Sequence, residues 1–287
     1  MNSPRILVTG ADGFLGRSTV RRLKAAGQTI LTLSRRPDGG DGIIHCDLRS
    51  TQDAWSMLGN VRPDVIVNLA AQVDFTAKVP NDLFSVNSMF PVIAAQYASA
   101  YGAWIVQASG TIVHGSHHRR IGEFTREQPD GAYGLSKLIA DKAIIDAGCG
   151  FSILRFGGIF GVDGPSHLKL NGSLREALFG VSPTLFGQGI ALRNYIYVED
   201  AARAIEYCVC NRPQGVFYCG GYTLSIRDML EAVSRELVSG AELQYAEGVD
   251  GSDQLVEISA GMPTPLTFDD ALRNIRHLAL QRGSTPC

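Results

Sequence analysis

The six cysteines of this sequence include no C-x-x-C pair, and its six histidines show none of the spacings typical of a metal site. No apolar run approaches the roughly 20 residues that a membrane-spanning helix needs. Neither sign of charge dominates, because 26 basic residues stand against 28 acidic ones. We therefore expect reduced thiols, no bound metal, and neither a nucleic-acid nor a membrane partner.

Internal repeats, low-complexity tracts and interdomain linkers are also missing from the sequence. Apolar residues make up 45% of the 287 residues and charged residues 19%, a composition that can build a large core. The first apolar run begins within five residues of the start, which leaves no room for a signal peptide. The sequence thus predicts a soluble, cytoplasmic protein whose parts are fused rather than tethered.

Apolar runs of strand length alternate with segments of helical periodicity over the first half of the chain. We expect strands near residues 5–9, 29–34, 43–46, 64–69, 103–109 and 151–155. We expect helices near residues 13–26, 50–58, 81–100, 131–147, 198–210, 225–238 and 267–281. Such alternation is typical of an α/β fold in which helices cover both faces of a doubly wound parallel sheet. After residue 155, glycine and proline interrupt the pattern and only short periodic pieces remain.

The first expected strand runs directly into a glycine-rich turn. The run Arg5-Ile6-Leu7-Val8-Thr9 is followed by Gly10, Gly13 and Gly16, and then by a helical pattern that closes at Gly27. This arrangement suits the pyrophosphate of a dinucleotide, because amides at the helix start and the helix dipole favour an anion, while side chains would block its approach. The spacing G-x-x-G-x-x-G is one residue wider at the first gap than the usual dinucleotide fingerprint.

The segment Tyr133-Gly134-Leu135-Ser136-Lys137 places a phenol and an ammonium four residues apart in an expected helix. Residues i and i+4 lie on one face of a helix, so the ammonium of Lys137 can lie beside the phenol of Tyr133. A nearby cation lowers the pKa of a tyrosine from its usual value of about 10. A tyrosine tuned in this way can exchange a proton with a sugar hydroxyl or ketone. The pair therefore predicts an acid/base centre.

Together with four further motifs, these two features resemble extended short-chain dehydrogenases/reductases of the nucleotide-sugar epimerase/dehydratase family. The further motifs are Asp47-Leu48, Asn68-Leu69-Ala70-Ala71, Val86-Asn87 and Arg193-Asn194-Tyr195-Ile196-Tyr197-Val198-Glu199-Asp200. In the family, the corresponding residues hold the adenine, line the cofactor, steady the active site and meet the substrate, in that order. The resemblance runs nearly from end to end of the chain.

The resemblance implies a Rossmann-type doubly wound parallel sheet with a smaller C-terminal substrate lobe. It implies an NAD(P)-binding domain in residues 1–155 and a substrate lobe, which crosses back to the sheet, in residues 156–287. It also implies a homodimer formed through the helices near residues 81–100 and 131–147. The implied cofactor contacts are Gly10, Gly13, Phe14, Leu15, Gly16, Asp47, Leu48, Leu69, Ala70, Ala71, Tyr133, Lys137, Phe156 and Ile159.

The end of the second expected strand bears on the choice of cofactor. A carboxylate there binds the ribose 2′-hydroxyl of NAD, whereas an arginine accommodates the 2′-phosphate of NADP. Here the strand ends in Ser34, Arg35 and Arg36 and carries no acid. A serine can hydrogen-bond the phosphate and an arginine can pair with it. We therefore expect NADP(H) as the favoured cofactor, with NAD(H) as the alternative.

The third catalytic position is ambiguous in this sequence. The family usually carries a serine or threonine at the end of the fifth strand, a few residues before a Tyr-Gly pair. Counting from the strand assigns this place to Ser109, whereas counting back from His114-Gly115 assigns it to Gly110 and makes Thr111 the candidate. Strand ends are positioned more rigidly than loops, which favours Ser109 and keeps Thr111 as the alternative. Either hydroxyl would bind the reacting oxygen of the substrate and hold it against Tyr133.

Two positions bear on the substrate. Arg193 matches the arginine that in the family meets the diphosphate of the substrate. Gly158 stands where the family usually carries an asparagine that touches the same diphosphate, and this departure weakens the expectation of a nucleotide sugar without removing it.

The leading expectation is an NADP(H)-dependent reductase that transfers hydride to a keto group of a nucleotide-linked deoxy sugar, a 4-ketoreductase with Tyr133 as acid/base. In this reaction Lys137 would also bind the nicotinamide ribose, and much of the rate would come from positioning the parts around one carbon. The enzymatic alternative is a nucleotide-sugar epimerase, which oxidises and then reduces the same carbon on its other face. An alternative of another class is a module that senses NADP(H) and performs no chemistry.

Overall fold

The computed structural model describes residues 3–34, 42–73, 81–239 and 241–281. The chain divides into two compact units. The first comprises residues 1–117, 124–156 and 202–218, and the second comprises residues 118–123, 157–201 and 219–287. The expected domains, residues 1–155 and 156–287, stay a prediction.

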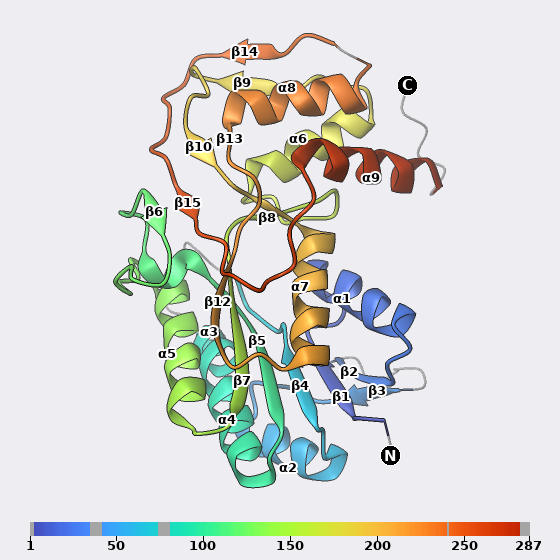
Figure 1. The fold of residues 1–287 in the computed structure, drawn as a ribbon, viewed down its shortest axis with the longest axis vertical. Coiled ribbons are helices and arrows are strands. Elements are labelled where there is room, and N and C mark those ends of the chain that lie inside the picture. The colour runs from blue at the N-terminus through green and yellow to red at the C-terminus, as the bar shows by residue number, and fades with distance from the viewer. Residues whose placement is uncertain (1–2, 35–41, 74–80, 240, 282–287) are drawn as a thin grey trace. The chain divides into compact units, whose positions relative to one another are not determined.

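A seven-stranded sheet forms the centre of the first unit (Figure 1). Its strands are β1 (Ile6–Thr9), β2 (Ile30–Ser34), β3 (Ile43–His45), β4 (Val65–Asn68), β5 (Trp104–Gly110), β7 (Gly150–Phe156) and β12 (Gly215–Cys219). They lie in the order β12-β7-β5-β4-β1-β2-β3, and the neighbours from β7 to β3 pair in parallel. This confirms the expected α/β fold with a doubly wound parallel sheet.

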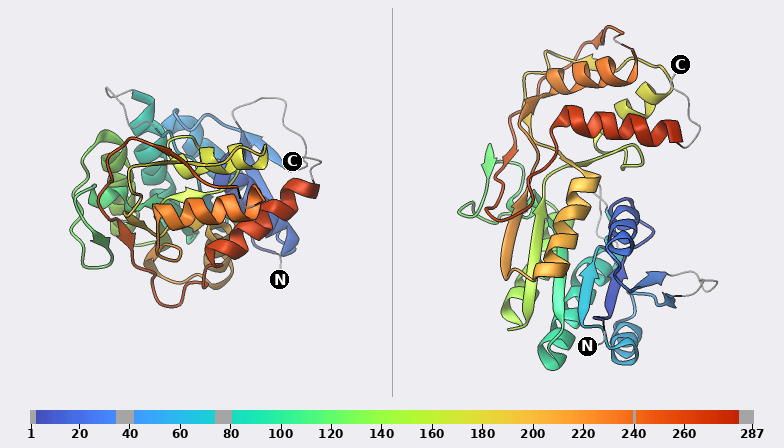
Figure 2. Two further views of the ribbon diagram at one scale, coloured as in Figure 1. Left: turned by 90° about the horizontal axis from the view of Figure 1, so that it is seen from above. Right: turned by 45° about the vertical axis from the view of Figure 1, so that its right-hand side comes forward.

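Helices cover both faces of this sheet (Figures 1 and 2). The helices α2 (Thr51–Val61), α4 (Phe90–Tyr101) and α5 (Ala132–Asp146) contribute side chains to a core that also contains Leu7 of β1 and Ile66 of β4. On the opposite face lie α1 (Phe14–Ala25) and α7 (Val198–Asn211). All four residues of β1 and of β4 are buried, which requires such cover on both faces.

The helix expected near residues 81–100 forms as three consecutive pieces. These are α3 (Asn81–Phe84), the π-helical turn η1 (Ser85–Met89) and α4 (Phe90–Tyr101). A π-helical turn inside a longer helix is rare and occurs frequently at functional sites. Here it carries Asn87, whose side chain is 1% exposed.

The second unit is built from helices and short paired strands. Its helices are α6 (Lys169–Leu178), α8 (Ile226–Leu237) and α9 (Phe268–Gln281). Its strand pairs are β6 (Arg120–Ile121) with β15 (Leu255–Val256), β8 (Ile159–Phe160) with β11 (Ile196–Tyr197), β9 (Thr184–Phe186) with β14 (Gln244–Ala246), and β10 (Leu192–Arg193) with β13 (Leu224–Ser225). A capping box formed by Ser225 and Asp228 begins α8, which packs against both α6 and α9.

The expected helices and strands are all present, but the sequence pattern does not predict α6, β12 or the short paired strands of the second unit. Leu170, Leu174 and Leu178 of α6 are buried and have the i, i+4 spacing of a helix, a signal that the surrounding glycines obscure. No helix that the structure describes is long and apolar enough to cross a bilayer. Within the same residues, no group of three or more His, Cys, Asp or Glu side chains is arranged to hold a metal ion.

Candidate active site

The glycine turn joins the end of β1 to the start of α1. Gly10 has φ +65°, and a Cβ atom on it would lie 2.7 Å from the amide nitrogen of Ala70. A Cβ atom on Gly16 would collide with the carbonyl oxygen of Gly10. Because β1 lies between β2 and β4, its carboxyl end is where an open α/β sheet forms its ligand crevice. The first turn of α1 carries no acidic residue, so no side-chain charge there repels an anion.

A cavity of about 370 Å³ opens beside the glycine turn, within the first unit. It brings together eight of the residues predicted to bind the cofactor: Gly10, Gly13, Ser34, Asp47, Leu48, Leu69, Ala70 and Ala71. The lining also includes Leu33, Cys46 and Arg49, which the sequence does not single out. A close-packed glycine turn beside a cavity with apolar walls and a few polar groups fits the adenosine and pyrophosphate of a dinucleotide.

The other residues predicted to bind the cofactor lie outside this lining. Phe14, Leu15 and Gly16 form the first turn of α1. Phe156 is buried at the end of β7, and Ile159 begins β8 in the second unit. Arg35 and Arg36 lie outside the described residues.

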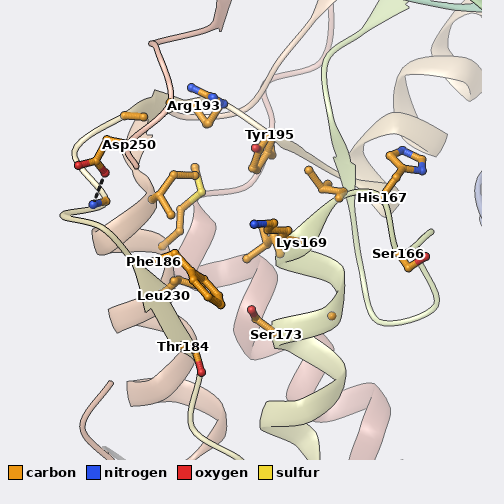
Figure 3. Close-up of a pocket in the computed structure, with 18 of the residues that line it drawn as sticks. Ser166, His167, Lys169, Ser173, Thr184, Phe186, Arg193, Tyr195, Leu230 and Asp250 are labelled. Atoms are coloured by element: carbon orange, nitrogen blue, oxygen red, sulfur yellow. Dashed lines mark hydrogen bonds between the residues drawn. The ribbon is translucent and has the colours of Figure 1, made fainter. Parts of the chain in front are cut away.

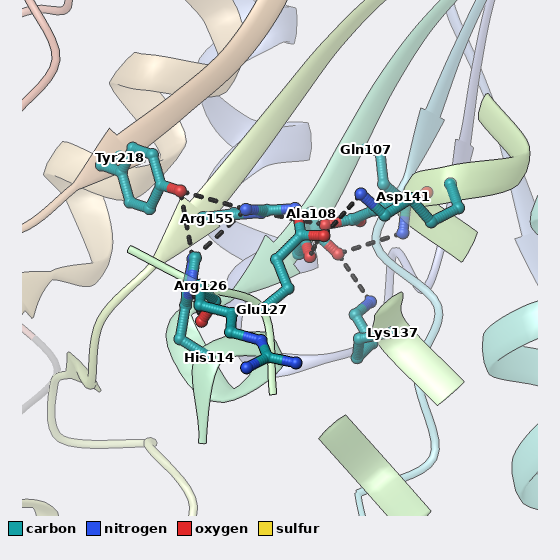
Figure 4. A network of polar contacts seen from close by, with 11 residues as sticks. Gln107, Ala108, His114, Arg126, Glu127, Lys137, Asp141, Arg155 and Tyr218 are labelled. Carbon is teal, nitrogen blue, oxygen red and sulfur yellow. Dashed lines mark hydrogen bonds and ion pairs between the residues drawn. The ribbon is translucent and has the colours of Figure 1, made fainter. Parts of the chain in front are cut away.

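Tyr133 and Lys137 lie one helical turn apart on α5, as the sequence predicts. The Tyr133 side chain is half-buried, whereas Lys137 is 3% exposed and its Nζ donates to the carbonyl oxygen of Ala108 at 2.6 Å (Figure 4). Burial raises the pKa of Tyr133 to about 12. Burial also lowers the pKa of Lys137 to about 8, against the opposing effect of Asp141. Burial of the phenol acts against the lowered tyrosine pKa that the sequence predicts, so a lowering by Lys137 stays a prediction.

Asn87 fixes the beginning of α5. Its Oδ1 accepts a hydrogen bond from the amide of Gln72 at 2.8 Å, and its Nδ2 donates to the carbonyl oxygen of Gln72 at 2.9 Å and to Ser136 Oγ at 3.1 Å. Ser136 Oγ in turn donates to the carbonyl oxygen of Tyr133 at 2.7 Å. These bonds tie the loop after β4 to the first turn of α5, so they hold the backbone of Tyr133 in place.

The two hydroxyls considered for the third catalytic position have different surroundings. Ser109 Oγ donates to Asp141 Oδ2 at 2.9 Å. Thr111 begins the 3-10 turn η2 (Thr111–His114) and is buried, and no hydrogen bond of its hydroxyl is found among the described residues. A Cβ atom on Gly110 would meet its nearest atom at 3.6 Å, an ordinary van der Waals contact, so packing leaves room for a side chain at this position.

A buried chain of hydrogen bonds leads from β1 across the sheet to Lys137. Thr9 Oγ1 donates to Asn68 Oδ1 at 2.6 Å, and Asn68 Nδ2 donates to Gln107 Oε1 at 2.8 Å. Gln107 Nε2 then donates to the carbonyl oxygen of Ala108, 3.2 Å away, which also accepts from Lys137. Thr9, Asn68 and Gln107 are each 1% exposed or less. The residue before the glycine turn is thus connected to the lysine of the predicted acid/base pair.

Arg155 links Asp141 to three further polar side chains, those of Glu127, Tyr218 and His114 (Figure 4). Its Nε donates to Asp141 Oδ2 at 3.1 Å, its Nη2 to Glu127 Oε1 at 2.5 Å, and its Nη1 to Tyr218 Oη at 3.0 Å. Nη1 also lies 3.2 Å from His114 Nε2. Because a guanidinium can only donate, His114 Nε2 must accept, and its Nδ1–H donates to the carbonyl oxygen of Arg126 at 3.1 Å. His114 is therefore neutral in this arrangement.

Sequence reasoning missed Asp141 and Arg155 as neighbours of the site. The available signal was the spacing of Asp141, which follows Lys137 by four residues and so lies on the same face of α5. Burial raises the pKa of the Asp141 carboxyl, and the guanidinium of Arg155 opposes this effect.

A second cavity, of about 640 Å³, lies within the second unit (Figure 3). Arg193 of β10 lines it, and its Nη1 donates to the carbonyl oxygens of Leu192 at 2.8 Å and Ser252 at 2.7 Å. Inside the cavity, Nζ of Lys169 lies 5.0 Å from the ring centre of Phe186. These positions combine cationic groups with a half-exposed aromatic ring, a set suited to a ligand with an anionic part and a flat part.

The ring of Tyr195 lies beside residue 158, where the family pattern has an asparagine and this chain has a glycine. A Cβ atom on Gly158 would lie 2.6 Å from Cδ1 of Tyr195, so the ring occupies the space that a side chain at 158 would need. Tyr195 lines the same cavity, where burial raises the pKa of its phenol and the guanidinium of Arg193 acts against this effect. The wall on this side of the cavity is therefore aromatic rather than an amide.

Residues 6–220, which include the glycine turn and the Tyr133/Lys137 pair, match the model of the NAD dependent epimerase/dehydratase family. The chain belongs to this family. It is therefore an enzyme of the extended short-chain dehydrogenase/reductase type, which agrees with the resemblance in its motifs.

Relatives of this epimerase/dehydratase family member include both reductases and epimerases. A dTDP-4-dehydrorhamnose reductase of Streptomyces griseus is 32% identical over 170 residues, which cover 58% of this chain and only 53% of that protein. A UDP-glucose 4-epimerase of Azospirillum brasilense is 24% identical over 316 residues, which cover 95% of this chain and 91% of that protein.

Solved structures share the fold of this family member. The UDP-N-acetylglucosamine 4-epimerase of Bacillus cereus has a TM-score of 0.80 at 23% identity, covering 96% of this chain and 99% of that chain. The Bordetella bronchiseptica enzyme WbmH, whose structure contains NAD⁺, has a TM-score of 0.78 at 18% identity, covering 94% of this chain and 96% of that chain. At these identities the likeness shows the fold alone.

Proposed function

We propose that the protein is an NADP(H)-dependent reductase that converts a keto group of a nucleotide-linked deoxy sugar to a hydroxyl. The observation that carries this proposal is the pairing of Tyr133 and Lys137 on one face of α5. The ammonium of Lys137 donates a hydrogen bond to the carbonyl oxygen of Ala108 on β5. When bound, a reduced nicotinamide would supply the hydride for the carbonyl carbon. The tasks left to the protein are to orient the substrate and to deliver a proton to the carbonyl oxygen.

The protonation state of Tyr133 suits the direction of reduction. With its pKa raised to about 12, the phenol keeps its proton at neutral pH and can donate it to an oxygen that becomes negatively charged. Thr111 or Ser109 would hold that oxygen against Tyr133. The hydrogen of the Ser109 hydroxyl already goes to Asp141, which favours Thr111 as the donor to the substrate.

The glycine turn and the adjoining cavity would hold the dinucleotide. Gly10, Gly13 and Gly16 would leave room for the pyrophosphate at the start of α1, and Asp47 and Leu48 would contact the adenine. At the end of β2, Ser34 lines the cavity, and the sequence continues with Arg35 and Arg36 rather than with an acid, which supports NADP(H) over NAD(H). The nucleotide part of the substrate is assigned to the cavity of the second unit, with Arg193 as a contact for its diphosphate.

Epimerisation is the second candidate, because the Azospirillum epimerase aligns over 95% of this chain. The two functions separate in one experiment. The purified protein is denatured, its bound nucleotide is identified, and turnover is measured on a panel of keto and hydroxy sugar nucleotides with NADPH, with NADH and without added cofactor. The proposal expects turnover of a keto sugar nucleotide that consumes NADPH. Turnover without added cofactor by protein that retains NAD would establish the epimerase instead.

Tyr133→Phe tests whether the protein performs this chemistry at all. The variant should lose turnover by about 10²–10⁴-fold, because it removes the proton donor. Its affinity for the dinucleotide should change little, since the phenol is only one contact among many. An unchanged turnover in Tyr133→Phe would refute the assigned role. Binding of NADP(H) without turnover of any sugar nucleotide would favour a sensing module.

A further inference from the structure

Asp141 is the most deeply buried carboxylate described near the predicted acid/base pair. Its side chain is 0% exposed, and it lies on α5 four residues after Lys137 and eight after Tyr133. Residues at this spacing form one row along a helix. The three titratable side chains of this row therefore lie on the same face, with Lys137 between the phenol and the carboxylate.

The two carboxylate oxygens of Asp141 differ in their hydrogen bonding. Oδ2 accepts hydrogen bonds from Ser109 Oγ at 2.9 Å and from Arg155 Nε at 3.1 Å. Oδ1 is buried and has no hydrogen-bond partner among the described residues. A buried carboxylate oxygen without a donor costs free energy, and such groups in native proteins call for an explanation. Serving only as an ion-pair partner of Arg155 would not require Asp141 to face Lys137.

The charges of the surrounding elements show what Asp141 balances. Lys137 and Arg155 are each 3% exposed, so two cations are buried on either side of it, from α5 and from β7. Two carboxylates oppose them, Asp141 between the cations and Glu127 at the outer end of Arg155. Lys142, which pairs with Glu127 at 2.5 Å, is exposed. The other groups that face this cluster, Tyr133, Tyr218 and the neutral His114, carry no charge at neutral pH. Without Asp141, the buried cations Lys137 and Arg155 would lose the carboxylate whose charge acts on both of them.

We propose that Asp141 is a positioning residue of the reaction, whose buried carboxylate keeps the ammonium of Lys137 charged and turns the hydroxyl of Ser109 away from the substrate. The inference rests on the proposed function, in which the charged lysine binds the nicotinamide ribose beside Tyr133. The buried ammonium has one hydrogen-bond acceptor in the described structure, the carbonyl of Ala108, and that dipole alone does not offset the loss of hydration. The carboxylate of Asp141, one helical turn away, offsets a further part of that loss, because opposite charges at this range favour the ionised form.

The experiment uses Asp141→Asn, which removes the charge and keeps the shape, and Asp146→Asn as the matched control. Asp146 is an exposed carboxylate at the end of the same helix. Protonation of Lys137 is followed by nuclear magnetic resonance of the lysine side-chain nitrogens, with the signal of Lys137 identified as the one lost in Lys137→Met. The pH dependence of kcat/KM is measured on the same proteins with the best substrate found.

The expected result is a lower titration midpoint for Lys137 in Asp141→Asn, by about one pH unit or more, and no shift in Asp146→Asn. The alkaline limb of the kcat/KM profile should move to lower pH by the same amount. Asp141→Glu, which restores the charge, should return both values toward those of the wild type. Asp141→Ser, which leaves space for water beside Arg155, is measured in place of Asp141→Asn if the latter does not fold.

An unchanged midpoint for Lys137 in the folded charge-removing variant overturns the inference. So does a lowered midpoint with an unmoved rate profile, because Asp141 would then have no effect on the reaction. The titration needs no substrate, so it distinguishes this inference from the proposed function. A wild-type protein that turns over no sugar nucleotide would refute the latter, and the titration would still decide whether Asp141 controls the charge of Lys137.

Discussion

Asn68 on β4 donates a hydrogen bond to Gln107 on β5 at 2.8 Å, and both side chains are fully enclosed between the helical layers. The two residues are paired directly across the parallel strands, so their side chains extend from the same rung of the sheet. Thr9 lies on the far side of Asn68 and the carbonyl of Ala108 on the far side of Gln107. Polar residues in the centre of a buried sheet are tolerated here because each finds a partner.

Replacing both members of this pair should cost less stability than the sum of the two single replacements. Gln107→Leu leaves Asn68 Nδ2 without an acceptor and should lower the free energy of unfolding by about 1–3 kcal/mol. Adding Asn68→Leu removes the stranded donor, so the double variant should be less destabilised than the sum of the two single variants. Urea unfolding of the four proteins measures the coupling. Strict additivity would show that the two amides act independently.

Two Gly→Ala substitutions, one at the glycine turn and one in α2, should have opposite effects on stability. Gly16→Ala places a Cβ atom against the carbonyl oxygen of Gly10, so it should distort the turn, destabilise the fold and raise the dissociation constant for NADPH on the order of tenfold or more. Gly59→Ala, in α2, meets nothing within 4 Å and should stabilise the protein by up to about 1 kcal/mol. Thermal unfolding and fluorescence titration with NADPH give both quantities. Equal effects of the two substitutions would remove the argument for a packed turn.

Thr111→Val and Ser109→Ala separate the two candidate hydroxyls. If Thr111 binds the reacting oxygen, Thr111→Val should lower kcat by about 10²-fold, as for loss of one donor to a developing oxyanion. Ser109→Ala removes a hydrogen bond to Asp141 and should have the smaller effect on kcat. Steady-state kinetics of both variants decide between them. A larger loss in Ser109→Ala would restore the assignment made from the sequence.

Burial of Lys137 predicts a particular dependence of stability on pH. The pKa of this lysine is lowered to about 8 in the folded protein from about 10.4 in an unfolded chain. Between these values the unfolded state holds the proton that the folded state has lost, so the free energy of unfolding should rise with pH. Relative to Lys137→Met, the rise from pH 8 to pH 10 should be at most about 3 kcal/mol. Chemical unfolding of both proteins at several pH values measures it, and parallel curves would contradict the lowered pKa.

Phe186 provides a test of the cavity in the second unit. Its half-exposed ring lines the cavity beside Lys169, so Phe186→Ala should raise KM for a sugar nucleotide about tenfold while leaving the affinity for NADPH unchanged. Phe179, which is 78% exposed and does not line the cavity, supplies the control Phe179→Ala. If the two variants have the same KM, the substrate binds elsewhere.

Features that arise from neighbours in the sequence could be predicted well. The strand–glycine–helix unit at Gly10 and the row formed by Tyr133 and Lys137 depend on period and spacing, and both stand in the structure as expected. The central sheet could be predicted because alternation of buried strands and helices permits few arrangements. The helix α6 was not predictable in the same way, since glycines and a proline surround it.

Features that depend on contacts between distant segments could not be predicted. The partner of Ser109 is a carboxylate 32 residues further along the chain, and the acceptor for Lys137 is a carbonyl 29 residues before it. The pKa of Tyr133 followed burial, which spacing along a helix does not report. The homodimer, the cytoplasmic location and the preference for NADP(H) stay predictions.

The most direct test of the central claim follows the hydride itself. NADPH carrying deuterium at the transferable position of nicotinamide C4 is incubated with the protein and a keto sugar nucleotide, and the product is examined by mass spectrometry. Our account predicts one deuterium on the carbon that bore the keto group, together with a stoichiometric loss of NADPH absorbance. The Tyr133→Phe variant should show neither deuterated product nor loss of absorbance. A product that forms at the wild-type rate without deuterium would contradict it.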